Sequence, residues 1–171
     1  MFQAQINYTK EDMLAYVRFH KKQKQKFIYI LSVLINVLLV LLLAAMLVFM
    51  IAFRETEMLR YFLLVAVMGV LYQFIDRINA GALLKTQKNQ ENVHWVFEDE
   101  AVRASAATVE STYRYDSFRE IFYSVKYRCY YLYLNAKTAV VLPERCLIGG
   151  DAAAFRGFLQ EKTGLEVKEV K

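Results

Sequence analysis

Two long apolar stretches stand out in the first half of the chain. Residues 27–53 run for 27 positions without a charged side chain. As a helix this stretch would be about 40 Å long, against about 30 Å of bilayer hydrocarbon. A cleavable secretory signal is the competing interpretation, but the apolar part of such a signal spans only ~7–15 residues. Here 26 residues precede the run, and the pattern predicts a membrane-spanning helix.

The second apolar stretch, residues 61–75, is shorter. Met58 and Leu59 extend it backward, because Arg60 can place its guanidinium among the headgroups, and apolar residues continue to Leu84. Since only a short connection separates the two stretches, we expect a two-helix transmembrane hairpin over residues 27–84. A single span followed by a helix lying in the membrane interface is the alternative.

Residues 1–26 combine a short alternating segment with a basic helix. Phe2–Tyr8 alternates loosely between apolar and polar positions, which is typical of a strand. Thr9 follows as a candidate N-cap, and Asp12 lies three residues further on, close to a capping box. We expect a helix that begins at Lys10 and continues directly into the first span.

From residue 91 onward, short alternating runs are separated by polar turns, and one helix follows them. Asp151 is a credible N-cap for a helix over Ala152–Lys162, and Gly164 is placed for a left-handed C-cap. We therefore predict an α+β cytoplasmic domain over residues 91–171, an antiparallel sheet closed by the C-terminal helix. The apolar stripe of that helix is Phe155, Phe158 and Leu159. The expected strands are 93–97, 101–106, 109–114, 120–125, 128–134 and 139–142, the last ended by Pro143.

Several stretches resemble one known family. The two spans precede "VFEDEAV", "TYRYDSFREIFYSVKYRCYYLYLNAKTAVVLPERCL" and "AAAFRGFLQEK". This combination resembles the YcxB-like family of bacterial membrane proteins over essentially the whole chain, with Glu144 where the family commonly has a lysine. The resemblance implies that the soluble part is similar to a pleckstrin-homology-like (PH-like) domain. It brings no established reaction and no catalytic residues that could be transferred.

Composition and charge indicate where the protein resides and which side of the membrane its termini face. Hydrophobic residues make up 57% of the chain and the mean hydropathy is +0.21, whereas soluble domains are ~45–50% apolar. Residues 1–26 hold six bases and two acids, while residues 91–171 hold eleven bases and twelve acids. Because Lys and Arg accumulate in cytoplasmic flanks, we predict a multi-pass protein of the cell membrane with both termini cytoplasmic.

The basic residues beside the spans are candidate contacts with anionic headgroups, so the lipid bilayer is an expected partner. No nucleic-acid partner is expected despite a pI near 9.1, because residues 91–171 are nearly neutral and lack the basic footprint of a nucleic-acid binder. The possible membrane-surface contacts are Arg18, Lys21, Lys22, Lys24, Lys26, Lys85 and Lys88.

Catalytic and metal chemistry find little support in the sequence. His20 and His94 have no second histidine at helical spacing, and Cys129 and Cys146 lack the Cys-x-x-Cys spacing of zinc and redox sites. Carboxylates are abundant but scattered. We therefore expect no catalytic residues, no metal site and no cofactor.

Seven of the twelve tyrosines lie between Tyr113 and Tyr133. Alternation places Tyr130 on one face of a strand and Tyr131 and Tyr133 on the other. The second face is either covered as part of the core, which is the interpretation we favour, or exposed as an aromatic surface for a partner or the membrane.

These features predict a non-enzymatic, membrane-anchored cytoplasmic interaction or regulatory module. Its protein partner is unknown, and a second copy of the chain is one candidate. The alternative is a subunit of an oligomeric channel or transporter, although Ser32, Asn36 and Gln73 are the polar residues within the spans and none is ionisable. A membrane enzyme with a cytoplasmic site is the third possibility.

Overall fold

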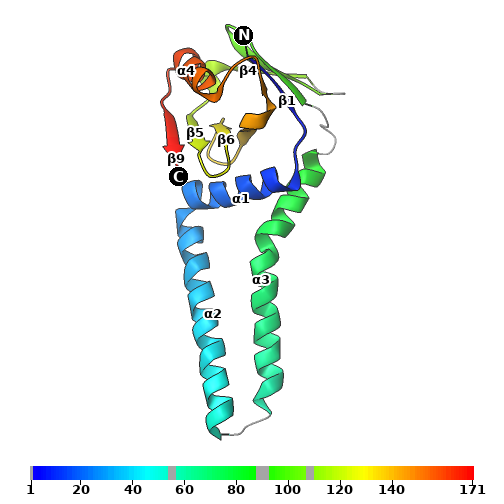
Figure 1. The fold of residues 1–171 in the computed structure, drawn as a ribbon, viewed down its shortest axis with the longest axis vertical. Coiled ribbons are helices and arrows are strands. Elements are labelled where there is room, and N and C mark those ends of the chain that lie inside the picture. The colour runs from blue at the N-terminus through cyan, green and yellow to red at the C-terminus, as the bar shows by residue number, and fades with distance from the viewer. Residues whose placement is uncertain (1, 54–56, 88–92, 107–109) are drawn as a thin grey trace.

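The computed structural model describes residues 2–53, 57–87, 93–106 and 110–171. A β-rich body stands at one end of two long helices, and a third helix lies across the junction between them (Figure 1). The four helices of the described chain are α1 (Lys10–Lys24), α2 (Lys26–Phe53), α3 (Met58–Gln87) and α4 (Ala152–Thr163).

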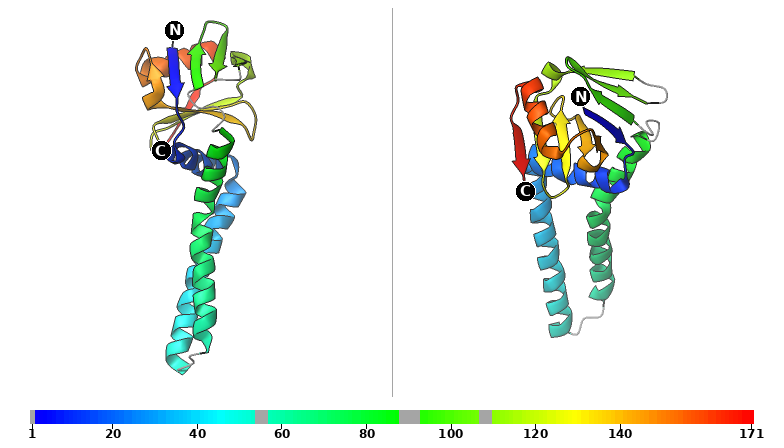
Figure 2. Two further views of the ribbon diagram at one scale, coloured as in Figure 1. Left: turned by 90° about the vertical axis from the view of Figure 1, so that its right-hand side faces the viewer. Right: turned by 45° about the horizontal axis from the view of Figure 1, so that its top comes forward.

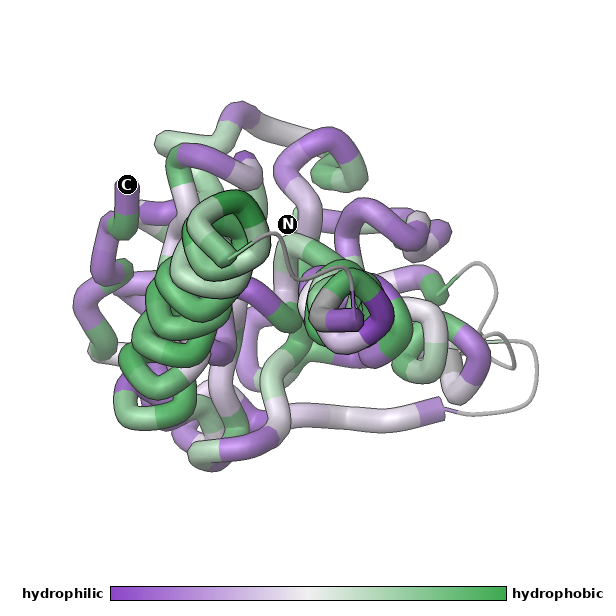
Figure 3. The backbone as a smooth tube through the Cα atoms, turned by 90° about the horizontal axis from the view of Figure 1, so that it is seen from below, coloured by the Kyte–Doolittle hydropathy of each residue, from purple (hydrophilic) through white to green (hydrophobic). Residues whose placement is uncertain are grey.

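The two expected spans are present as α2 and α3. Both are long and apolar enough to cross a membrane, and almost none of their surface is buried inside the protein. Figure 3 shows hydrophobic residues over most of both helices, more uniformly along α2. They pack closely where Gly69 of α3 meets Leu39 of α2, since a Cβ at Gly69 would lie 2.6 Å from a Leu39 methyl group. Of the expected connection, residues 54–60, residues 54–56 lie outside the described residues, and α3 already begins at Met58.

Helix α1 begins where the sequence predicts but ends before α2 begins. The Thr9 side chain accepts a hydrogen bond from the Asp12 amide, and the Asp12 carboxylate accepts one from the Thr9 amide, which completes the capping box. The helix stops at Lys24, and Gln25 adopts a non-helical conformation before α2 begins. The expectation of one continuous helix is therefore wrong: α1 lies across the ends of α2 and α3 (Figure 1).

The body contains two sheets (Figure 2). The first has the order β4-β3-β2-β1-β8 and is antiparallel throughout; the second has the order β7-β6-β5-β9. The strands of the first sheet are β1 (Phe2–Ile6), β2 (Val93–Phe97), β3 (Ala101–Ser105), β4 (Glu110–Arg114) and β8 (Leu147–Ile148). Those of the second are β5 (Glu120–Ser124), β6 (Cys129–Tyr133), β7 (Ala139–Pro143) and β9 (Val167–Val170).

Two features of the body differ from the sequence prediction. Strand β1 pairs with β2 and β8, so residues 2–6 fold with the C-terminal half although the sequence placed them in a separate N-terminal segment. Strand β9 follows α4 and pairs parallel to β5, so the sheets are not wholly antiparallel and the helix is not the last element. The coarse layout of apolar helices plus an α+β body is confirmed.

The main core lies between the two sheets and is closed by α4. Asp151 caps α4 through a hydrogen bond from the Ala154 amide, and Gly164 ends it in the left-handed conformation. Phe155 and Leu159 are fully buried, while Phe158 is partly buried against the same core. The predicted apolar stripe of this helix therefore points inward.

A second core covers the opposite face of the β7-β6-β5-β9 sheet. Tyr131 and Tyr133 of β6 are buried there, and α1 covers them with Phe19. The Phe19 and Tyr131 rings stack with centroids 4.1 Å apart. Strand β6 is thus buried on both faces, and its tyrosines belong to the core instead of forming an exposed aromatic surface.

Candidate functional site

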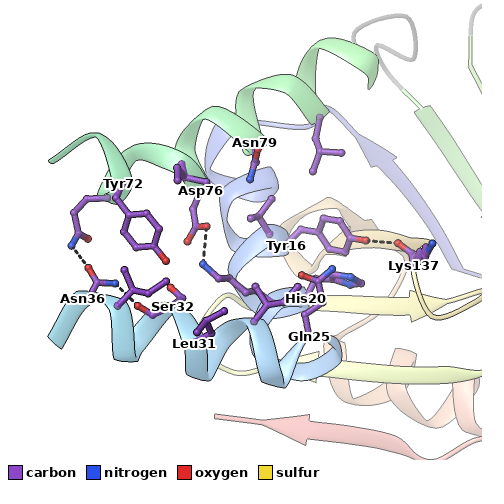
Figure 4. A pocket seen from close by; sticks show the side chains of 17 residues that line it. Tyr16, His20, Gln25, Leu31, Ser32, Asn36, Tyr72, Asp76, Asn79 and Lys137 are labelled. Atoms are coloured by element: carbon purple, nitrogen blue, oxygen red, sulfur yellow. Dashed lines mark hydrogen bonds and ion pairs between the residues drawn. The ribbon is translucent and has the colours of Figure 1, made fainter. Parts of the chain in front are cut away.

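A large hollow lies where α1 crosses α2 and α3. We call it the interhelical pocket; its volume is about 590 Å³ (Figure 4). The three helices and the turn after β6 form its walls, which contain both apolar and polar side chains. The lining residues are Tyr16, Val17, His20, Lys21, Gln25, Ile28, Leu31, Ser32, Ile35, Asn36, Tyr72, Gln73, Ile75, Asp76, Asn79, Leu83 and Lys137.

Two hydrogen bonds that involve α2 and α3 shape one side of this pocket. The Gln73 Nε2 donates to Asn36 Oδ1 at 2.6 Å, which ties α3 to α2. The Asn36 Nδ2 in turn donates to the Ser32 carbonyl at 2.7 Å, one turn back along α2. An interhelical amide pair of this kind is a common link between helices in lipid. The side chains of Asn36 and Gln73 therefore form one contact between the helices, in which Ser32 takes part through its backbone carbonyl.

Lys21 and Asp76 mark the end of the interhelical pocket nearest α1. The Lys21 Nζ lies 3.4 Å from the Asp76 carboxylate, so α1 is joined to α3 by an ion pair. Ile28, Leu31 and Ile35 provide an apolar wall on α2. A cavity that combines this apolar wall with the polar groups of Lys21 and Asp76 and of Asn36 and Gln73 has the chemistry to hold an amphiphile.

The surroundings of His20 could not be predicted from the sequence alone. Helix α1 turns this residue toward the body, where its Nδ1 lies 3.0 Å from the Tyr133 hydroxyl. Burial and the nearby Lys24 ammonium lower the pKa of His20. The residue is thus part of the contact between α1 and β6, a neutral hydrogen-bonding partner near pH 7.

The predicted membrane-surface contacts separate into two groups. Lys21 and Lys24 are bound within the protein, Lys21 to Asp76 and Lys24 to Glu120 at 2.7 Å. The hydrogen bond from Lys24 also lowers the pKa of the Glu120 carboxyl. Lys88 lies outside the described residues. The other candidates are exposed and make no ion pair with the described residues. The exposed candidates are Arg18, Lys22, Lys26 and Lys85.

A second hollow, of about 310 Å³, lies at the junction of α1 with the start of α2 and the turn after β5. We call it the basic hollow. Arg18 and Lys22 of α1 line it together with Lys126 of the turn and Lys171. The sequence analysis missed Lys126 because it lies about a hundred residues from α1. The full lining is Arg18, Phe19, Lys22, Tyr29, Asp76, Ser124, Lys126, Tyr127, Val170 and Lys171.

Within the described residues, neither hollow gathers a cluster of metal-ligating side chains. Within the described part of the chain, no group of three or more His, Cys, Asp or Glu side chains is placed to hold a metal ion. Cys129 is buried, and burial raises the pKa of its thiol to about 12, so it stays protonated and unreactive at neutral pH. Cys146 is half-buried, and burial raises the pKa of its thiol as well.

Comparison with known proteins gives one result. A family model described as "YcxB-like protein" matches residues 97–159. The match begins at the last residue of β2 and ends within α4, so it covers most of the β-rich body. Over these residues the chain is similar to the YcxB-like family, which confirms the resemblance for this part of the sequence. No curated protein and no solved structure matches the chain.

Proposed function

We propose that this YcxB-like chain is a non-enzymatic, membrane-anchored interaction or regulatory module. In this proposal α2 and α3 span the cell membrane, both ends of the chain are cytoplasmic, and the β-rich body lies on the inner membrane surface. The module binds a partner there, either a protein, a second copy of the chain or a lipid, and it binds no nucleic acid and uses no cofactor.

The observation that carries this proposal is the packing of α1 on two sides. Phe19 and Tyr16 face the aromatic core under β6, while Lys21 pairs with Asp76 of α3. The body and the membrane helices are therefore joined through one helix and its side chains. A partner that moves the body, or a ligand that fills the interhelical pocket, would act on that same helix, which is what a regulatory module requires.

The charge distribution supports the proposed orientation. Residues 1–26 carry six bases against two acids, and Arg77 and Lys85 follow the second apolar stretch. Both ends of the hairpin that face the body are thus basic, whereas the segment between the spans, residues 54–60, has two bases and two acids. Basic flanks are retained in the cytoplasm.

The PH-like character of the body is part of the same proposal. The position of α4 supports this part of the proposal, because α4 packs against both sheets and fills the core between them with Phe155 and Leu159. Strands β1 and β9 are additions that a single sheet closed by a terminal helix would not include.

Crosslinking in intact cells followed by affinity capture tests the function. Tagged protein is crosslinked, solubilised in detergent and purified, and the captured proteins and lipids are identified. We expect one crosslinked partner, or a specific lipid, that is lost when Phe19→Ala frees α1 from the body. Recovery of no partner together with no lipid preference would contradict the proposal.

A channel or transporter subunit is the second candidate. The observation in its favour is the interhelical pocket, which places Ser32, Asn36 and Gln73 side by side within the spans. Ion flux through liposomes that contain the purified chain would support this candidate. A membrane that stays impermeable to ions would leave the interaction module as the better account.

A further inference from the structure

The basic hollow collects positive charge that the protein itself does not neutralise. Arg18 and Lys22 come from α1 and Lys126 from the turn between β5 and β6, and within the described chain none of the three forms an ion pair. Their neighbours Lys21 and Lys24 are both paired. The Asp76 carboxylate also lines the hollow, but Lys21 already binds it. Lys171 lines the hollow as well, so four cations face one cavity, and within the described chain none of the four forms an ion pair.

The same turn exposes an apolar residue. Among the described residues outside α2 and α3, Val125 and Ile148 are the large hydrophobic side chains that are exposed, and Val125 is 42% exposed. Lys126 follows it, with its Nζ 5.6 Å from the centre of the Tyr127 ring. An exposed valine, a lysine and a tyrosine in succession suit the interface between headgroups and hydrocarbon.

The position of the hollow agrees with that depth. Tyr29, in the first turns of α2, lines it from the side of the membrane helix. Tyrosines are enriched at the two membrane interfaces. The basic hollow therefore lies where the headgroups of surrounding lipids begin, provided that α2 spans the membrane as the proposed function requires.

We propose that the basic hollow binds the phosphate of an anionic phospholipid headgroup. Arg18 offers a planar fork of donors to the phosphate oxygens, while Lys22 and Lys126 act as point charges from two sides. A bilayer lipid is the occupant because its glycerol and chains extend naturally past Tyr29 and Val125 into the hydrocarbon. This inference deepens the proposed function by naming one ligand class and one site.

Spin-labelled lipids measure the inference directly. The full chain is placed in vesicles of phosphatidylcholine, in phosphate-free buffer, with a trace of spin-labelled phosphatidylglycerol or spin-labelled phosphatidylcholine. The immobilised fraction of each label gives the preference for the anionic lipid. We expect that preference to fall about fivefold in Lys22→Ala and in Lys126→Ala, because a cation near an anionic surface is worth ~1 kcal/mol. Lys126→Arg should retain it.

Lys10→Ala is the matched control, since Lys10 is an exposed lysine at the other end of α1. If Lys10→Ala lowers the preference as much as Lys126→Ala, the attraction is diffuse and the site is refuted. Inorganic phosphate, added against sodium chloride of equal ionic strength, separates the sources of phosphate. If it displaces the labelled lipid more than chloride does, the hollow is a free-anion site and the lipid assignment fails. Neither result would affect the crosslinked partner on which the proposed function depends.

Discussion

Phe155 and Phe158 lie one turn apart on α4 but differ in burial. Phe155 is fully buried, with its ring centroid 4.9 Å from that of Phe97 and 5.3 Å from that of Tyr130. Phe158 is only partly buried and contacts the Phe2 ring at 5.1 Å. Since the cost of deleting a side chain grows with the cavity left behind, the two positions should respond differently.

Phe155→Ala should lower the free energy of unfolding by ~3–5 kcal/mol, because it removes a fully buried ring and leaves a cavity in the main core. Phe158→Ala should cost less, about 1–3 kcal/mol, because part of its ring already meets water. Thermal melts of the full chain in detergent measure both; the full chain is needed because β1 supplies a central strand. Arg156→Ala, which loses a partly exposed pair with Glu169, should change little. Equal stability of Phe155→Ala and wild type would refute this packing.

Asp12 combines a helix cap with an ion pair. Its side chain is 8% exposed, and Arg145 donates to both of its carboxylate oxygens at 2.8 and 2.6 Å. Burial alone would raise the pKa of Asp12, but the hydrogen bonds from Arg145 and Thr9 outweigh it and hold the pKa below its usual value. The carboxylate therefore stabilises the fold in its ionised form.

Asp12→Asn should destabilise the protein by about 1–3 kcal/mol at neutral pH, since the cap and the charge-assisted hydrogen bonds are weakened. A depressed native pKa gives stability that is present above the unfolded pKa of ~3.9 and lost as the pH falls through the lower native pKa. The gap between wild type and Asp12→Asn should therefore narrow below about pH 4. Melting curves from pH 7 to pH 3, with the exposed Glu11→Gln as control, check this. A gap that stays constant with pH would exclude the ion pair as its cause.

At the scale of elements, α1 is the part on which the architecture depends. It covers the second core with Phe19, whose ring also meets Phe122 edge-on at 5.6 Å. It reaches α3 through Lys21 and the body again through Lys24 and Glu120. A helix with contacts on both sides transmits displacement between the body and the spans.

Phe19→Ala should detach α1 from the sheet, because the ring is 3% exposed and its loss leaves a cavity against Tyr131. We expect a loss of ~3–5 kcal/mol and faster amide hydrogen exchange in α1 and β6, while α4 stays protected. Hydrogen exchange with mass spectrometry resolves these segments, and the exposed Lys10→Ala is the control on the same helix. Unchanged protection in α1 would show that Phe19 does not hold the helix in place.

Local signals predicted most of the elements but not how they pair. The capping residues Thr9 and Asp151 and the left-handed Gly164 fixed helix ends from sequence alone. The break at Gln25 could not be predicted from the sequence, because a glutamine has no tendency to end a helix. The helix ends there because α1 packs under the sheet. Strand β1 was expected as a strand, but its pairing with β2, about 90 residues away, carries no local signal.

At the scale of the whole molecule, the two long apolar helices and the body meet at a basic, aromatic junction. The sequence predicted Arg18 and Lys22 as surface cations because they flank an apolar run. It could not predict Lys126 beside them, because that contact requires the tertiary fold. It also could not separate the paired Lys21 and Lys24 from the unpaired Arg18 and Lys22, since the acids that bind the former, Asp76 and Glu120, are distant in sequence.

The central claim is that α2 and α3 cross the membrane and keep the body on its cytoplasmic side. Single cysteines test it in a background of Cys129→Ala and Cys146→Ala, with an impermeant maleimide added to intact cells. We predict that Thr56→Cys, between the spans, is labelled in intact cells and that Lys137→Cys, in the exposed turn after β6, is labelled only after lysis. Labelling of Lys137→Cys in intact cells, or of Thr56→Cys only after lysis, would contradict the account.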